Sequence, residues 1–246
     1  MSFLLVERED RVLHLTLNRP DKRNALNSAL CAELVARITE AQNDNSVGSI
    51  LLDASGRVFC SGMDLDEAVG SLGMEAAAIH EELFSIGRKS RKPIVVCVNG
   101  PAMGGGLGLV AQAHVAIAAQ GALFGLTEIR VGLWPFVVYR SIEAAVGARR
   151  TLELSLTGRL FSTQEALQWG LIQSVAHAFE VDDRANAVAR DLAKASPLAI
   201  SLGMEYVHSS RCKTWTQAGD IAVKLRAKSM VSADFKEGVA AFHEKR

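Results

Sequence analysis

The strongest constraint on this chain is a long stretch without any charged side chain. No Asp, Glu, Lys or Arg occurs between Pro93 and Thr127. A stretch of this length invites comparison with a membrane span. However, Pro101, several glycines and three polar residues divide it into pieces of strand and helix size. We therefore expect a buried region of a folded domain and no contact with a membrane.

The glycines and apolar runs of this stretch predict a covered sheet. We expect buried strands at 94–98 and about 113–118, and a short strand near 122–124. Between the first two lie a tight turn and a glycine-led helix at about 104–112. Apolar strands without alternation are typical of a sheet that is covered on both faces.

The flanking sequence alternates between strand and helix patterns, which indicates parallel strands joined by crossover helices in an α/β fold. Expected strands are 3–6, 12–17, 49–52 and 171–175, with residues 7–11 as a hairpin turn. Expected helices begin near Asn27 and cover 74–89, 137–146, 149–156, a short piece after the capping box at 162–165, and 182–195. Helices starting at 197, 214 and 234 follow.

We expect two parts, an α/β core at 1–190 and a helical C-terminal region at 191–246. A helical tail on a body of this size favours packing against another subunit, so an oligomer is predicted.

Composition restricts the partners. The formal net charge is +0, which disfavours nucleic acid and anionic membrane surfaces. The four cysteines are scattered without a CxxC pair, which favours reduced thiols in a cytoplasmic protein and disfavours a metal site. Charged residues at 7–10 come too early for the apolar region of a signal peptide.

Candidate functional groups lie near the middle and at the end of the uncharged stretch. Glycines at 104–106 let another molecule approach the first N–H groups of a helix, which can hold an anion or a developing oxyanion. Glu128 is the first charged side chain after the stretch. A carboxylate at the edge of a dry interior is costly unless it is paired or used. A plain packing turn and a surface glutamate are the alternative interpretations.

Four separated segments form a recognisable set: residues 24–27 (NALN), 59–65 (FCSGMDL), 98–107 (VNGPAMGGGL) and 234–246. Together they resemble the crotonase (enoyl-CoA hydratase/isomerase) family, of the type with a single glutamate. Residues 59–65 resemble its first signature and residues 98–107 its second, while residues 24–27 are similar to its coenzyme A loop and residues 234–246 to its usual ending. The resemblance covers nearly the whole chain.

This resemblance implies a spiral of ββα units with a helical trimerisation region, and a homotrimer or a dimer of trimers. It implies an acyl-CoA enzyme that needs no cofactor, since coenzyme A is part of the substrate. Glu128 matches the general acid/base, and the N–H groups of Ser61 and Gly105 match the oxyanion hole. Residues implied near coenzyme A are Lys22, Arg23, Ala25, Ser61, Met63, Asp64, Leu65, Gly104, Phe242 and Lys245, the last two often reaching a neighbouring subunit.

Other residues have two interpretations. Trp134, Phe136 and Tyr139 line an acyl pocket or serve packing alone. Asp64 binds substrate or caps the following turn. His80 lies on a helix that borders the pocket and is a candidate for catalysis, whereas His114, in an apolar segment, is expected to be a satisfied core residue.

The chain departs from two-glutamate hydratases at Gly108, where the second glutamate would stand. A single carboxylate suffices to carry a proton between two carbons, so the sequence favours a 3,4-to-2,3 enoyl-CoA isomerase. A 2-enoyl-CoA hydratase and a non-catalytic acyl-CoA-binding member are the alternatives. Ser61 lacks a G-x-S-x-G elbow, which disfavours covalent catalysis there or at Cys60. The glycine spacing also misses the dinucleotide-binding motif.

Overall fold

The first two strands form an antiparallel hairpin at the edge of the main sheet. In the computed structural model, which describes residues 2–70 and 74–245, β1 (Leu4–Glu9) pairs with β2 (Val12–Leu17). The expected turn at 7–11 is therefore too long, because the strands continue to Glu9 and only two residues turn. Asp10 occupies this turn with a φ of 51°. An edge strand tolerates charges because every β1 residue after Leu4 is exposed.

Four further strands extend the sheet in parallel. The strand order is β1-β2-β3-β4-β6-β9, with β3 (Ser49–Ala54), β4 (Ile94–Val98), β6 (Val115–Ala119) and β9 (Ser174–Ala176). The predicted α/β class is confirmed. The predicted last strand starts three residues too early.

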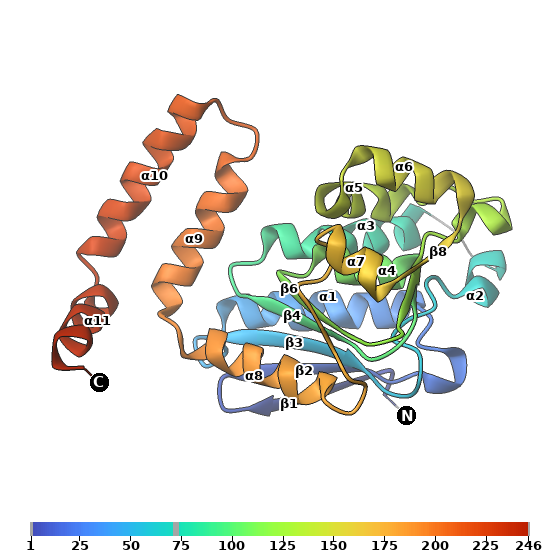
Figure 1. Ribbon diagram of the computed structural model, residues 1–246, viewed down its shortest axis with the longest axis horizontal. Helices are drawn as coiled ribbons and strands as arrows, with labels where there is room; N and C mark the ends of the chain where they lie inside the picture. The colour runs from blue at the N-terminus through green and yellow to red at the C-terminus, as the bar shows by residue number, and fades with distance from the viewer. Residues whose placement is uncertain (1, 71–73, 246) are drawn as a thin grey trace.

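Helices cover both faces of this sheet (Figure 1). On one face, alternate strand residues such as Leu51, Val95 and Ile117 pack against α8 (Val181–Lys194). The α8 side of this contact consists largely of alanines, two of which, Ala185 and Ala189, are fully buried. The other face carries the larger core beneath α1 (Ser28–Asn43) and α3 (Met74–Lys89). The expectation of a sheet covered on both faces is confirmed.

A second, three-stranded sheet lies beside the glycine-led helix. It consists of β5 (Ala102–Met103), β7 (Leu123–Gly125) and β8 (Leu160–Ser162). The helix α4 (Gly105–Gln112) follows β5 directly. The short strand expected near 122–124 corresponds to β7, whereas β5 and β8 were not expected, because neither forms an apolar run that stands out from the turn around it.

Most remaining helices begin where capping residues predict. The Asn27 side chain accepts a hydrogen bond of 3.0 Å from Leu30 N–H, and the capping box at Ser162 and Glu165 is formed. The body also contains α5 (Phe136–Val146), α6 (Ala148–Thr157) and α7 (Thr163–Gln168), while α2 (Leu65–Gly70) and two short 3-10 helices, Pro20–Lys22 and Glu128–Val131, were not expected.

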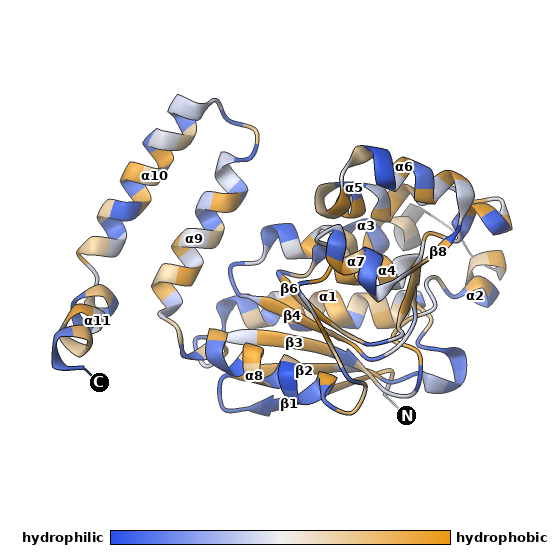
Figure 2. Cartoon of the chain, in the orientation of Figure 1, coloured by the Kyte–Doolittle hydropathy of each residue, from blue (hydrophilic) through white to orange (hydrophobic). Residues whose placement is uncertain are grey.

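The last three helices project away from the body (Figure 1). They are α9 (Pro197–Ser210), α10 (Trp215–Met230) and α11 (Ala233–Glu244). Figure 2 shows apolar residues along their surfaces, and neither α9 nor α11 contains a buried residue. The division at residue 190 stays a prediction; that residue lies inside α8. Arg246, the end of the last motif, lies outside the described residues.

No helix in the described part of the chain is long and apolar enough to cross a membrane.

The crossing of α3 and α4 yields a stability test. A Cβ on Gly87 would lie 2.1 Å from the carbonyl oxygen of Gln112. Because backbone atoms cannot step aside, Gly87→Ala is expected to lower the free energy of unfolding by about 3 kcal/mol. Gly203→Ala is the matched control, since its Cβ meets nothing within 4 Å and alanine favours a helix. Urea unfolding measures both, and equal stabilities would contradict the tight crossing.

Candidate active site

The site is built around a glycine turn at the start of α4. Gly104 has a φ of +51°, and its N–H donates to Gly125 O at 2.8 Å. Gly105 follows as the first residue of the helix, where a backbone N–H has no partner inside the helix. A Cβ on Gly105 would lie 2.9 Å from Leu26 Cδ1. The positive φ favours glycine at 104, and a side chain at 105 would displace the end of the Leu26 side chain. Within residues 2–70 and 74–245, the N–H of Gly105 has no hydrogen-bond partner.

The segment around Met63 lies beside this turn. Leu26 N–H donates to Gly62 O at 2.8 Å, and Asp64 N–H donates to Leu26 O at 3.0 Å. In a parallel bridge of this kind, the N–H of the residue between those two groups points to the opposite side of the strand. The N–H of Met63 therefore points away from Leu26. It has no hydrogen-bond partner among residues 2–70 and 74–245.

The two free N–H groups lie close to one another. A Cβ on Gly62 would lie 3.4 Å from the Gly105 nitrogen, so the chain just before Met63 touches the start of α4. Met63 and Gly105 both line the same cavity. The geometry gives a pair of backbone donors at one wall of a pocket, as an oxyanion site requires.

The structure corrects one of the predicted donors. Ser61 N–H donates to Arg23 O at 3.0 Å, so it is already used. The prediction that this N–H belongs to the oxyanion hole is wrong, and Met63 offers the available group. The motif alone did not reveal this, because the bridge with Leu26 decides which N–H of the turn stays free.

Glu128 faces the glycine turn from the first position of its 3-10 helix. Its Oε1 lies 3.0 Å from where a Cβ on Gly104 would stand. Its Oε2 is buried without a hydrogen-bond partner in the described chain. Desolvation raises the pKa of this carboxyl group above its ordinary value. The alternative of a plain surface glutamate is therefore excluded.

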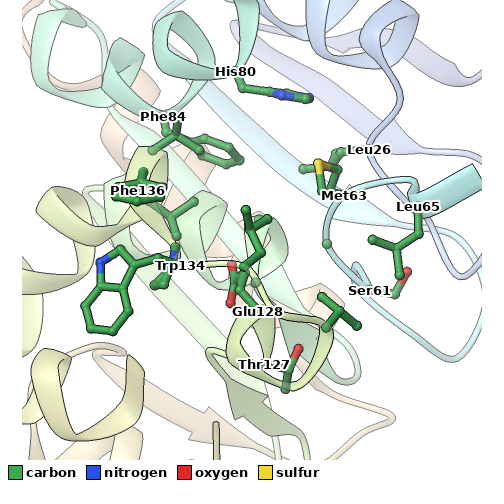
Figure 3. A pocket seen from close by; sticks show the side chains of 18 of the residues that line it. Leu26, Ser61, Met63, Leu65, His80, Phe84, Thr127, Glu128, Trp134 and Phe136 are labelled. Atoms are coloured by element: carbon green, nitrogen blue, oxygen red, sulfur yellow. The ribbon is translucent and has the colours of Figure 1, made fainter. Parts of the chain in front are cut away.

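A cavity of about 270 Å³ connects these groups (Figure 3). Its described lining is mostly apolar, and the polar side chains in it include Ser61, His80, Thr127 and Glu128. Trp134 and Phe136 line it as predicted, but Tyr139 does not. The ring of Tyr139 stacks on Trp134 with centroids 6.1 Å apart, so its contribution is to packing behind the wall.

Gly108 marks the place where a second acid would stand. A Cβ there would lie 2.6 Å from Val138 Cγ1 and 2.9 Å from Phe84 Cδ1. Both of these apolar residues line the cavity. The space for a second carboxylate is therefore filled, and the surroundings of Glu128 stay apolar on this side.

His80 is a polar group of the cavity wall that has no partner. It lies on α3 with 8% of its surface exposed, and its Nε2 is buried without a hydrogen bond to the described residues. Burial lowers the pKa of the imidazole, and the nearby Glu67 carboxylate acts in the opposite direction. The ring is therefore neutral near pH 7.

Cys60 and His114, the two other residues with reactive side chains considered above, have no part in the cavity lining; Cys60 is buried and His114 is half-buried. Burial raises the pKa of Cys60 to about 12, so its thiol is a poor nucleophile. His114 accepts a hydrogen bond from Ile94 N–H at 2.8 Å, and its Nε2 lies 3.1 Å from Gly87 O. Burial lowers the pKa of His114 to about 4. The expectation of a satisfied core histidine is confirmed.

The loop implied near coenzyme A borders the site. The Arg23 carbonyl holds Ser61, and Lys22 forms an exposed ion pair of 2.9 Å with Asp66. Ala25 is buried beside Leu26, while Leu65 lines the cavity mouth and is half exposed. The positions of these residues are compatible with the implied contacts, which stay predictions.

Asp64 is occupied by structural contacts. Its carboxylate accepts from Arg19 at 2.9 Å and from the Asp66 N–H at 3.2 Å. Desolvation acts to raise its pKa, but the Arg19 and backbone hydrogen bonds outweigh it and hold the pKa below its ordinary value. Asp64 thus caps α2, in agreement with the second of its two interpretations.

Phe242 and Lys245 lie far from the cavity in this chain. Phe242 lies on α11 and Lys245 ends it, at the opposite end of the molecule from α2 (Figure 1). The tail leads away from the body, so these residues do not reach the chain's own cavity. A contact with coenzyme A through them requires a neighbouring subunit.

Comparison with known proteins identifies the family of this chain. The family model described as "Enoyl-CoA hydratase/isomerase" matches residues 7–246. The 1,2-epoxyphenylacetyl-CoA isomerase of Escherichia coli (strain K12) is 31% identical, over 100% of this chain and 97% of that protein. The 2,3-dehydroadipyl-CoA hydratase of the same strain is 34% identical, over 100% and 97%.

Solved structures agree with the sequence relatives. The crystal structure of an enoyl-CoA hydratase from Mycobacterium smegmatis superposes with a TM-score of 0.95 at 29% identity, covering 100% of this chain and 98% of that one. Human enoyl Coenzyme A hydratase domain-containing protein 3 gives a TM-score of 0.95 at 28% identity, with the same coverage.

The desolvated carboxylate of Glu128 leads to a prediction about stability. Glu128→Gln is expected to raise the free energy of unfolding near pH 7 by about 0.5–2 kcal/mol, because it removes a charge from an apolar site. Below the ordinary value of 4.5, both the folded and the unfolded chain hold the proton, so the difference disappears. As the pH rises above that value, the unfolded chain ionises first and the native protein loses stability relative to the variant.

Urea unfolding across this pH range measures the difference. The exposed Glu82 on α3 supplies the control variant Glu82→Gln, which is expected to leave the free energy of unfolding within about 0.5 kcal/mol of the native value near pH 7. A Glu128→Gln variant that is less stable than the native protein near pH 7 would contradict the desolvated carboxylate.

Proposed function

The chain belongs to the enoyl-CoA hydratase/isomerase family, and within it we propose an enoyl-CoA isomerase that moves a double bond from the 3,4 to the 2,3 position. The single observation that supports this most directly is the pairing of one desolvated carboxylate with two free backbone N–H groups. Glu128 is the proposed general acid/base. Met63 and Gly105 are the proposed oxyanion donors.

The proposed reaction starts at the carbon next to the thioester carbonyl. Removing a proton from C2 places negative charge on the carbonyl oxygen. The N–H groups of Met63 and Gly105 are free to donate hydrogen bonds to that oxygen. Each such donor contributes about 3 kcal/mol in a site shielded from water. The charge of the enolate is thereby offset without any rearrangement of the backbone.

A raised pKa suits Glu128 for the proton transfer. A carboxylate of higher pKa is a stronger base and takes the C2 proton more readily. Returning the same proton at C4 completes the shift of the double bond, with no water consumed and no second acid required. The apolar filling by Val138 and Phe84 at Gly108 supports this single-carboxylate route.

Hydration of a 2-enoyl-CoA is the second candidate. The name of the Escherichia coli 2,3-dehydroadipyl-CoA hydratase, a relative at 34% identity, favours it. Addition of water needs a base for the water and an acid for C2. Glu128 has no second carboxylate opposite it at Gly108, which favours isomerisation over hydration.

The substrate proposed is an acyl-CoA of modest size. The cavity volume of about 270 Å³ corresponds to about nine water-sized groups. Coenzyme A is proposed to follow the loop of Lys22, Arg23 and Ala25, because this loop is hydrogen-bonded to the segment that carries Met63. Phe242 and Lys245 are proposed to approach coenzyme A from a neighbouring subunit.

We propose that the tail packs against other copies of the chain, in a homotrimer or a dimer of trimers. Trp215 is 94% exposed, Val223 70% and Phe242 81%. Large apolar side chains gathered on one projecting region mark an interaction surface.

The reaction is tested by a paired assay on the purified protein. Offered 3-enoyl-CoA and 2-enoyl-CoA of several lengths, the enzyme is expected to isomerise the first and to hydrate the second slowly. Glu128→Gln is expected to lower kcat at least about 100-fold, since it removes the proton carrier. Glu82→Gln serves as the control with full activity. Rapid hydration would favour the alternative, and full activity of Glu128→Gln would contradict the role of Glu128.

Assembly is tested by light scattering coupled to size exclusion. The native protein is expected at three or six times the chain mass of 26.4 kDa. Val223→Lys is expected to shift it towards the single chain, because a charge on the apolar face of α10 opposes burial. Val69→Lys, at a position on α2 that is 92% exposed, is the control. A native protein of one chain mass would overturn the proposed assembly.

A further inference from the structure

His80 has a role that the proposed reaction leaves open. Its side chain extends from α3 to the wall of the cavity, within a mostly apolar lining (Figure 3). The residue is 92% buried, given its exposure of 8%, and Nε2 has no hydrogen-bond partner in the described chain. Leaving such a group unpaired costs about 1–3 kcal/mol, a cost that an apolar side chain at this position would avoid.

We propose that His80 determines substrate specificity by hydrogen bonding a neutral oxygen, a hydroxyl or a keto group, on the acyl chain. The inference rests on the proposed function, because it places the acyl chain in the cavity of Glu128. It adds the substrate class, an oxygenated acyl-CoA, which the double-bond shift itself does not require.

The position of His80 separates this oxygen from the reacting carbons. Figure 3 places His80 and Glu128 on opposite sides of the cavity, with Phe84 and Met63 between them. No contact joins the two polar side chains. An oxygen bound by His80 therefore belongs to a different part of the acyl chain from the carbons that exchange a proton with Glu128.

The local charges favour a neutral group over a carboxylate. Glu67, on α2, lies close enough to act on the imidazole, and its carboxylate accepts a hydrogen bond of 2.8 Å from Ser28 N–H. A second carboxylate brought into the same apolar wall would be repelled and would lose its water. A hydroxyl or keto oxygen meets neither cost.

A plain hydrocarbon chain would leave His80 unpaired in the complex. A site built to bond a substrate oxygen rejects the analogue that lacks it, because the buried polar group of the protein then stays without a partner. A preference of about ten- to a hundredfold for the oxygenated chain is expected from one such bond.

The test compares straight-chain 3-enoyl-CoA thioesters with counterparts of equal length that carry a hydroxyl or a keto group at each carbon beyond C4. The native protein is expected to prefer at least one oxygenated chain, mainly through a lower KM. His80→Phe is expected to abolish that preference while it still turns over the plain chain. His80→Gln, whose amide offers both a donor and an acceptor, is expected to restore part of it.

Calorimetric binding to the Glu128→Gln variant, with and without His80→Phe, separates this inference from the reaction. A preference that is kept in binding, while the native protein with Glu128 intact turns over none of the 3-enoyl thioesters, supports the role of His80 and contradicts only the proposed reaction. Equal affinities for plain and oxygenated chains, or a preference that survives in His80→Phe, would overturn the role of His80. Thermal melting of each variant verifies that it is folded.

Discussion

The site depends on the close approach of backbone to backbone at the start of α4. Gly62 touches the nitrogen of Gly105, and Gly104 touches the carboxylate of Glu128. A Cβ on Gly62 would lie 3.0 Å from Met103 O, and one on Gly104 would lie 3.0 Å from Glu128 Oε1, so a side chain at either glycine would displace its neighbours. The proposed donors and the carboxylate come this close together because Gly62, Gly104 and Gly105 have no side chain, and the bridge between Leu26 and Met63 holds the first of these segments in register.

The apolar surroundings of Glu128 come from the same packing. Phe84 on α3 and Val138 on α5 meet above Gly108 and leave no room for another polar side chain. No second carboxylate can therefore stand at position 108 while these two side chains keep their places. Desolvation raises the pKa of Glu128 and outweighs the opposing hydrogen bond to the residue's own backbone.

Much of this architecture was predictable from the sequence, and the failures have physical causes. Long periodic segments such as α1 and buried runs such as β4 carry a clear signal. The turn after β1 was misplaced because an exposed edge strand accepts the same charged residues as a loop. Met63 was missed as a free donor because its availability depends on a bridge to Leu26, a contact between segments distant in sequence. Glu128 could be identified from the sequence because burying a lone carboxylate after an apolar run costs free energy, which indicates that the residue has a function.

The bridge between Leu26 and Met63 has a mechanical consequence. One short ladder joins the loop of Lys22, Arg23 and Ala25 to the donor at Met63, through Ser61 and Gly62. A displacement of this loop on binding the nucleotide end of a ligand would be transmitted to Met63, because the peptide units between them are rigid and hydrogen-bonded. With coenzyme A bound to this loop as proposed, binding energy gained at the nucleotide end would align the thioester at Met63, and an acyl thioester that lacks the nucleotide would react more slowly as well as bind more weakly.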